Sequence, residues 1–274
     1  MKKTFLLLSY FALLSSGAFA QDTIPVKPLK KVLELVVPRE GGANAASVAW
    51  HPVLKRYYAA MAGNAEFFIG AFSTTGKLLT KPDQETMFDI RGLWYNPLTK
   101  TLQMNGYGDY GWGEYKLGPT GAPISVKTIV KEKTQPDDQS TGAFDPVNKK
   151  VYFLNEDGNI DVYDAKTAEI KETLELTLGY SESEAEEEID IDNADVYEEY
   201  NYTTVVYTGM KNAEIGLLNT VTREIEMYDL KTGHVTRKFS LPEEAPAETA
   251  LNFAYANGIF WLFDTEARIW KGYK

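Results

Sequence analysis

The segment Phe144–Thr167, FDPVNKKVYFLNEDGNIDVYDAKT, contains one structural unit in a short space. A short apolar strand ends at Asp145-Pro146, two lysines follow in the turn, and a second strand begins at Val151. A turn containing Gly158 leads to a third short strand, after which another turn begins. Short apolar runs separated by Pro, Gly and Asn are typical of antiparallel β-hairpins.

The same unit recurs along the chain, and a fixed repeat is the first feature to test in any sequence. Five first-strand residues are spaced 44, 50, 62 and 47 positions apart: Trp50, Trp94, Phe144, Val206 and Phe253. A third-strand aromatic follows each of them: Phe72, Tyr115, Tyr163, Tyr228 and Trp270. Four short strands per unit at this period predict a β-propeller. A β-sandwich with coincidental hairpins is the alternative.

Residues 144–167 resemble the repeat of the YVTN/YncE-like β-propeller superfamily, and residues 228–233 resemble it in part. The resemblance implies a propeller fold and a secreted setting. It implies no catalytic residues, because that superfamily has no shared catalytic set and a fold does not by itself define a function.

The fifth unit has only three strands before Lys274, whereas the apolar segment 31–37 precedes the first unit without a partner. Pairing this segment as the missing outer strand would close the ring and remove an exposed edge. We therefore expect an all-β domain over residues 29–274, a small propeller of five four-stranded blades closed by an N-terminal strand. A sixth blade between residues 180 and 205 is the alternative.

Residues 1–20 have the pattern of a secretory signal peptide: Lys2 and Lys3, an apolar run, and Ala18-Phe19-Ala20 before the expected cleavage site. The apolar run is too short for a membrane span, which is the alternative interpretation. We expect an exported protein, periplasmic or secreted and not inserted in a membrane, in which residues 21–28 form a linker.

The composition narrows the classes of partner. The chain has no cysteine, which excludes disulfides, a thiol nucleophile and thiolate metal sites. Its net charge of −11 becomes −13 once Lys2 and Lys3 leave with the signal peptide (−11 minus 2). So acidic a protein is a poor partner for nucleic acid, anionic lipid or other polyanions, whereas cations and basic partners remain possible.

Two irregular stretches, 105–113 and 181–201, fall on the same face of the predicted ring, opposite the X-Pro turns. Irregular loops on a rigid scaffold are common recognition sites. In the first stretch we predict that Tyr107, Asp109, Tyr110 and Trp112 bind a ligand, as a stacking platform for a sugar or peptide. A tight hairpin whose aromatic rings pack on a neighbouring blade is the alternative.

The second stretch is strongly acidic, with ten carboxylates between Glu182 and Glu199. It is either a solvated loop or a weak calcium site formed by Asp190, Asp192, Asn193 and Asp195, because calcium prefers oxygen ligands. The spacing lacks the glycine and the twelfth-position glutamate of an EF-hand. We expect no cofactor, apart from this weak calcium site as the alternative.

Histidine is too scarce for a zinc site or a Ser-His-Asp triad, since His51 and His234 both occupy predicted turns. The starts of the first strands carry no ring of carboxylates. We therefore predict a non-enzymatic binding or scaffold module for a protein, peptide or glycan. A cation-assisted hydrolase or lyase is the alternative.

Overall fold

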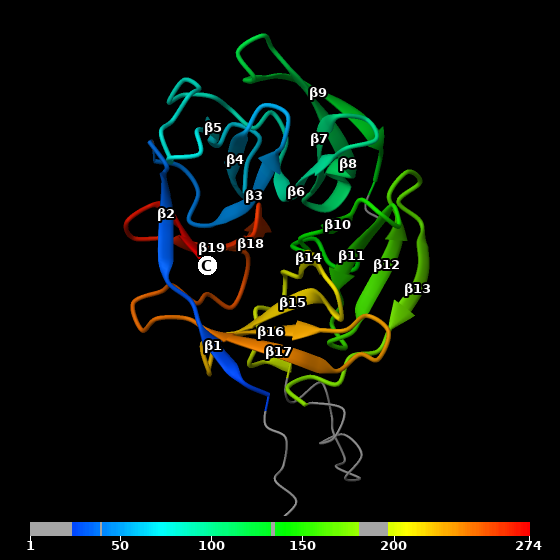
Figure 1. Ribbon diagram of the computed structural model, residues 1–274. Coiled ribbons are helices and arrows are strands. Elements are labelled where there is room, and N and C mark those ends of the chain that lie inside the picture. The colour runs from blue at the N-terminus through cyan, green and yellow to red at the C-terminus, as the bar shows by residue number, and fades with distance from the viewer. Residues whose placement is uncertain (1–23, 39, 133–134, 181–196) are drawn as a thin grey trace, which may run out of the picture.

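Five β-sheets stand around a common axis, each with its first strand nearest the centre (Figure 1). The computed structural model describes residues 24–38, 40–132, 135–180 and 197–274. This arrangement is the predicted five-bladed β-propeller. The predicted signal peptide lies outside the described residues.

The strands follow the chain from blade to blade. Blade one has β3 (Ala45–His51), β4 (Arg56–Met61) and β5 (Ile69–Phe72). Blade two has β6 (Ile90–Asn96), β7 (Thr101–Gly106), β8 (Trp112–Leu117) and β9 (Pro123–Val130). Blade three has β10 (Ala143–Asp145), β11 (Lys150–Leu154), β12 (Ile160–Asp164) and β13 (Ile170–Leu174). Blade four has β14 (Val206–Met210), β15 (Ala213–Asn219), β16 (Glu224–Tyr228) and β17 (Val235–Ser240). Blade five has β18 (Phe253–Ala256), β19 (Ile259–Asp264), β20 (Ile269–Tyr273) and, from the N-terminal part of the chain, β2 (Lys31–Val36).

Blade one differs from the predicted pattern, because an irregular segment takes the place of its fourth strand. This segment makes isolated bridges from Leu78 to Phe72 and from Glu85 to Phe68. Pro82 lies between them and has no N–H to give to a ladder. The outer position is therefore filled without a continuous strand.

The predicted closure is confirmed. Strand β2 pairs antiparallel with β20, with Leu35 opposite Trp270 and Val36 opposite Ile269. In Figure 1 the blue β2 lies against the red strands at the end of the chain. The last blade thus gains its outer strand from the beginning of the domain.

Residues 26–28, which the sequence analysis assigns to a linker, instead form strand β1 (Val26–Pro28). This strand pairs parallel with β17, with Val26 opposite Lys238 and Pro28 opposite Ser240. Proline is tolerated in an edge strand of this kind. The N-terminal segment therefore covers the outer edges of both blade four and blade five.

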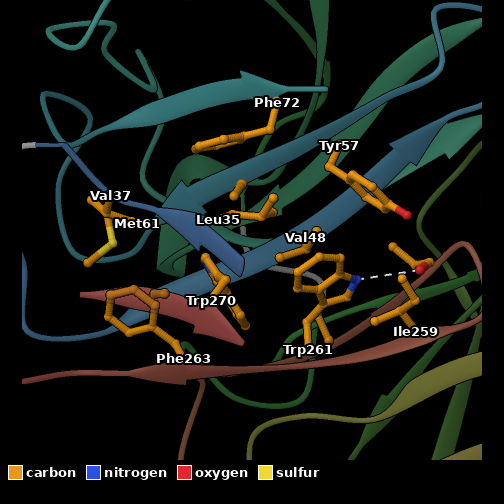
Figure 2. Close-up of a cluster of buried hydrophobic side chains, with 14 of the residues drawn as sticks. Leu35, Val37, Val48, Tyr57, Met61, Phe72, Ile259, Trp261, Phe263 and Trp270 are labelled. Carbon is orange, nitrogen blue, oxygen red and sulfur yellow. Dashed lines mark hydrogen bonds between the residues drawn. The ribbon is translucent and has the colours of Figure 1, made fainter. Parts of the chain in front are cut away.

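The closing strand is fixed by side-chain packing as well as by its ladder. Leu35 is fully buried in a cluster with residues of blades one and five, among them Met61, Phe72, Trp261 and Trp270. Figure 2 shows these side chains directed toward one another, with the Trp261 indole donating to the Ala256 carbonyl at 3.4 Å. The predicted third-strand aromatics are all buried: Phe72, Tyr115, Tyr163, Tyr228 and Trp270.

The X-Pro turns share one chemistry. The backbone N–H of Leu54 donates to His51 Nδ1, that of Leu98 to Asn96 Oδ1, and that of Val147 to Asp145 Oδ1. His51 is thus a turn residue, as predicted. Among the described residues no helix is long and apolar enough to cross a bilayer.

Replacing Leu35 with alanine tests the closure. We expect the free energy of unfolding to fall by about 2–5 kcal/mol, because the change leaves a cavity in the cluster that holds β2. The adjacent Val36 is 53% exposed, and Val36→Ala should change stability by no more than about 0.5 kcal/mol. Urea unfolding followed by circular dichroism measures both. Equal effects at the two positions would contradict the closure by packing.

Candidate functional site

The two faces of the ring carry different connections. One face, the X-Pro face, carries the turns from first to second strand, at residues 52–55, 97–100, 146–149, 211–212 and 257–258. The opposite face, the loop face, carries the second-to-third-strand turns and the blade-to-blade connections. These include 107–111, 131–142 and the long connection from β13 to β14.

A cavity of about 470 Å³, the central cup, occupies the axis of the ring. All five blades line it through their first strands. Its lining includes Pro52, Pro97 and Pro146 of the X-Pro turns, whereas toward the loop face it extends only to residues such as Thr141 and Val205 that adjoin the first strands. The cup therefore opens on the X-Pro face. Its volume is within the range of about 300–1,000 Å³ that is usual for ligand sites.

Every blade contributes at least one aromatic residue to the wall of the cup. We call five of them, one per blade, the collar residues: Trp50, Tyr95, Phe144, Tyr207 and Tyr255; Trp94 and Phe253 also line the cup. Of the collar residues, Phe144 is buried and the other four are half-buried. Four of the collar rings pack against a second ring. The distances between ring centroids are 4.7 Å for Trp50 and Tyr57, 4.5 Å for Tyr95 and His51, 5.7 Å for Tyr207 and Tyr152, and 4.9 Å for Tyr255 and Phe260. The supporting rings limit the freedom of the collar before any ligand arrives.

The inner end of the cup contains polar groups, and hydrogen bonds near it join neighbouring blades. The N–H of Thr141 donates to the Thr203 carbonyl at 2.8 Å, whereas its buried hydroxyl has no hydrogen-bond partner among the described residues. Asn105 Oδ1 of blade two accepts from the N–H groups of Gly92 and Gly142, which joins blades two and three. These bonds join neighbouring segments on the loop-face side of the first strands.

Blades five and one are joined in the same way, since Asn252 Oδ1 accepts from the Ala45 N–H at 2.7 Å. The amide of Asn201 donates to the Leu251 carbonyl, which ties the connection before blade four to blade five. Sequence reasoning did not identify these asparagines. A buried amide that links two blades has no signature within one repeat.

Among the described residues, no Asp, Glu, Lys, Arg or His side chain lines the cup. Its titratable groups are tyrosines, and burial raises the pKa of both Tyr207 and Tyr255 above the ordinary value. Their hydroxyls are therefore neutral at physiological pH. The cup is an apolar, aromatic and uncharged cavity.

The predicted platform is only partly at the surface. On the loop face, Tyr107 is 38% exposed and its ring lies 4.7 Å from the guanidinium of Arg91, which pairs with Asp89 at 2.6 Å. Tyr110 is 43% exposed and rests edge-on against Phe88.

Trp112, by contrast, is 1% exposed and packs among Trp94, Phe153 and Tyr163. The structure places it in the core between blades two and three instead of in a surface platform. This occurs because it begins strand β8, where alternate side chains point into the space between blades.

Asp109 and Tyr110 line a second cavity of about 500 Å³, together with Phe88, Val126 and Lys131. This cavity is more open to solvent and is formed by blade two and the segment that leads into it. The cup, by contrast, is lined by all five blades. The loop face chosen from sequence therefore does not carry the convergent cavity, which opens on the opposite side.

Asp190, Asp192, Asn193 and Asp195 lie outside the described residues, so the calcium site stays a prediction. In the part of the chain that the structure describes, no group of three or more His, Cys, Asp or Glu side chains is placed to hold a metal ion.

Among the comparisons with known proteins, the search of solved structures found similar folds. No family model matches the chain, and no curated protein matches it. Among solved structures, glutaminyl cyclase of Myxococcus xanthus superposes with a TM-score of 0.55 and 9% identity, over 91% of this chain and 97% of that one. A chain of a nidogen/laminin complex superposes with a TM-score of 0.42 and 11% identity. The match covers 72% of this chain and 63% of that one. At such identities the likeness shows the fold alone.

Alanine substitutions separate the two aromatic residues of the 107–112 segment. Trp112→Ala should lower the free energy of unfolding by about 3–5 kcal/mol, because it empties a large volume in the core. Tyr110→Ala should cost about 1 kcal/mol or less, since much of that ring is in solvent. Thermal and urea unfolding measure both. A destabilisation by Tyr110→Ala as large as that of Trp112→Ala would show that both rings are core residues.

Proposed function

We propose that this chain is a non-enzymatic binding propeller, and that the central cup holds part of a partner protein or peptide. The observation that carries the proposal is the collar. Five blades each contribute an aromatic side chain to one cavity that has no charged lining. Amphipathic rings held in place by neighbours bind apolar groups at a small cost in conformational entropy.

The chemistry of the cup favours binding over catalysis. General acid–base catalysis needs a group whose pKa is near the working pH. The cup presents tyrosines whose pKa lies above the ordinary value, together with Ser47, Thr141, Thr208 and Asn257. Cation-assisted hydrolysis would also need carboxylates, which do not line this cavity. The cited neighbours include an enzyme and a component of a complex, so the fold itself supports neither function.

A protein or peptide suits the cup better than a glycan. Sugars present many hydroxyl groups, and burying these without hydrogen bonds is costly. The wall is mostly apolar, with polar groups at Ser47 and Thr141 toward the inner end and at Thr208 and Asn257 toward the mouth, and it suits a large apolar side chain instead.

The finer features of the proposal rest on sequence. The signal-peptide pattern of residues 1–20 supports export to the periplasm or beyond. The blade-three repeat supports a place among YVTN/YncE-like propellers. Both agree with a propeller that meets its partner outside the cytoplasm.

Selection from a random peptide display library tests this function. Peptides selected on the wild-type protein should bind it in fluorescence polarisation, and Val147→Trp should weaken them roughly tenfold or more, because a bulky ring at the mouth obstructs the cup. Val147 lines the mouth and is 79% exposed, so the domain should still fold. Mass spectrometry should recover the peptides intact.

Val221→Trp is the matched control, since Val221 is 68% exposed in a turn of blade four on the loop face. It should leave the affinity unchanged. If peptides bind the Val147→Trp protein normally and lose affinity after Tyr107→Ala with Tyr110→Ala, the binding site is on the loop face. Peptide turnover would contradict a non-enzymatic role.

A further inference from the structure

We propose, on the basis of the proposed function of the cup, that its ligand is an acidic segment of a partner protein. In this segment a large apolar side chain enters the cup while flanking carboxylates meet a ring of lysines around the mouth. The ring consists of Lys55, Lys100, Lys149 and Lys211, one from each of blades one to four. All four side chains are exposed.

The lysines occupy equivalent turns close to the lining of the cup. Lys55, Lys100 and Lys149 each come three residues after a lining proline, and Lys211 comes two residues after the lining residue Gly209. They are therefore carried by the rim itself.

Turn geometry does not account for these lysines. Lys55, Lys100 and Lys149 have φ of 51°, 60° and 57°, in the left-handed region that Gly and Asn adopt more readily. At the corresponding turns, blades four and five place Asn212 and Asn257 in this conformation. Three blades thus use lysine where a residue better suited to the backbone is available.

Other basic residues with positive φ have structural partners. Arg223 donates to the carbonyls of Pro242 and Glu243, and Arg268 donates to those of Gly41 and Gly42. The four rim lysines, by contrast, form no ion pair within the described parts of the chain. Their charge is available to a ligand.

Two carboxylates close to the rim accept hydrogen bonds from backbone N–H groups of the protein itself. Asp145 is fully buried and accepts from the N–H groups of Val147 and Asn148. Glu214 accepts from the N–H groups of Asn212 and Leu230. In a chain of net charge −11, the mouth of the apolar cavity thus carries four exposed lysines that form no ion pair among the described residues. This complementarity selects an anionic partner.

An apolar shoulder lies in the same turns as the lysines. Val53, Leu98 and Val147 directly follow the three turn prolines and are 72%, 60% and 79% exposed. Equivalent apolar residues left in solvent at one mouth indicate an interaction surface. From the axis to the rim, the aromatic cup is thus followed by the apolar shoulder and then by the ring of lysines.

A peptide fits this order better than a fatty acid does. Four lysines on four different blades cannot converge on the single carboxylate of a fatty acid, whereas an extended acidic segment presents several separated carboxylates. Each flexible lysine can then meet a different one. The cup holds the apolar side chain between them.

The experiment compares short synthetic peptides with one central tryptophan flanked by glutamates, glutamines or lysines. The wild-type protein should bind the glutamate peptide roughly tenfold more tightly than the glutamine peptide, and salt should reduce the difference. Lys100→Glu with Lys149→Glu should weaken the glutamate peptide about tenfold and strengthen the lysine peptide. Isothermal titration and fluorescence polarisation measure these affinities.

Lys81→Glu with Lys131→Glu is the matched control, because it makes the same charge change at exposed positions outside the X-Pro turns: Lys81 is in the irregular outer segment of blade one and Lys131 follows β9. It should leave the affinities within about twofold of the wild type. Circular dichroism and thermal melts confirm that both double variants fold. An equal loss in the control would show a nonspecific charge effect and overturn the proposal.

The possible outcomes distinguish a failure of the acidic specificity from a failure of the proposed binding function of the cup. If the glutamate and glutamine peptides bind equally and Val147→Trp weakens both, the acidic specificity is wrong and the binding function stands. If neither these peptides nor the library peptides depend on the cup, the function itself fails. Binding to phosphatidylglycerol vesicles through Lys100 and Lys149, without peptide binding, would replace the peptide with a lipid and overturn the inference.

Discussion

The pairing of β2 with β20 is the interaction on which the rest of this structure depends. Without this pairing, blade five would have only three strands. Its outer edge would then be unpaired, and the boundary between blades five and one would be uncovered. Leu35 links the ladder to the core, because it is buried between the aromatic side chains of blade five and those of blade one. Strand β1 extends the same segment over blade four, so one stretch of chain secures two neighbouring blades.

Closure of the ring is also what creates the candidate site. Each first strand alone presents an aromatic residue near the turn that follows it, and only the closed ring brings the five around one axis. The same closure brings Asn105, Thr203 and Asn252 to the other end of the axis, where their hydrogen bonds join neighbouring segments. Polar hydrogen bonds thus join the blades toward the loop face, and an apolar cavity lies toward the X-Pro face.

The two faces therefore differ in a way that loop length does not reveal. The loop face carries the irregular connections, including Tyr107 and Tyr110 beside the buried Arg91–Asp89 pair. The X-Pro face carries short turns, and in the three X-Pro turns a backbone N–H donates to the side chain that precedes the proline. The exposed side chains after each of these prolines are mainly apolar or basic. Regular turns can hold a recognition surface as well as irregular ones, because the backbone fixes the turn while the side chains remain variable.

The sequence by itself determined the repeat, the first-strand and third-strand positions, the turn role of His51 and the closing strand at residues 31–37. These features are local: strand alternation, X-Pro turns and an unpaired apolar segment can each be recognised within a short stretch. Only the tertiary structure decided that Trp112 is core while Tyr110 is exposed, that residues 26–28 pair with blade four, and that Tyr95, Tyr207 and Tyr255 meet in a cup. Those facts depend on which side chains from distant segments share a space, and no single repeat contains that information.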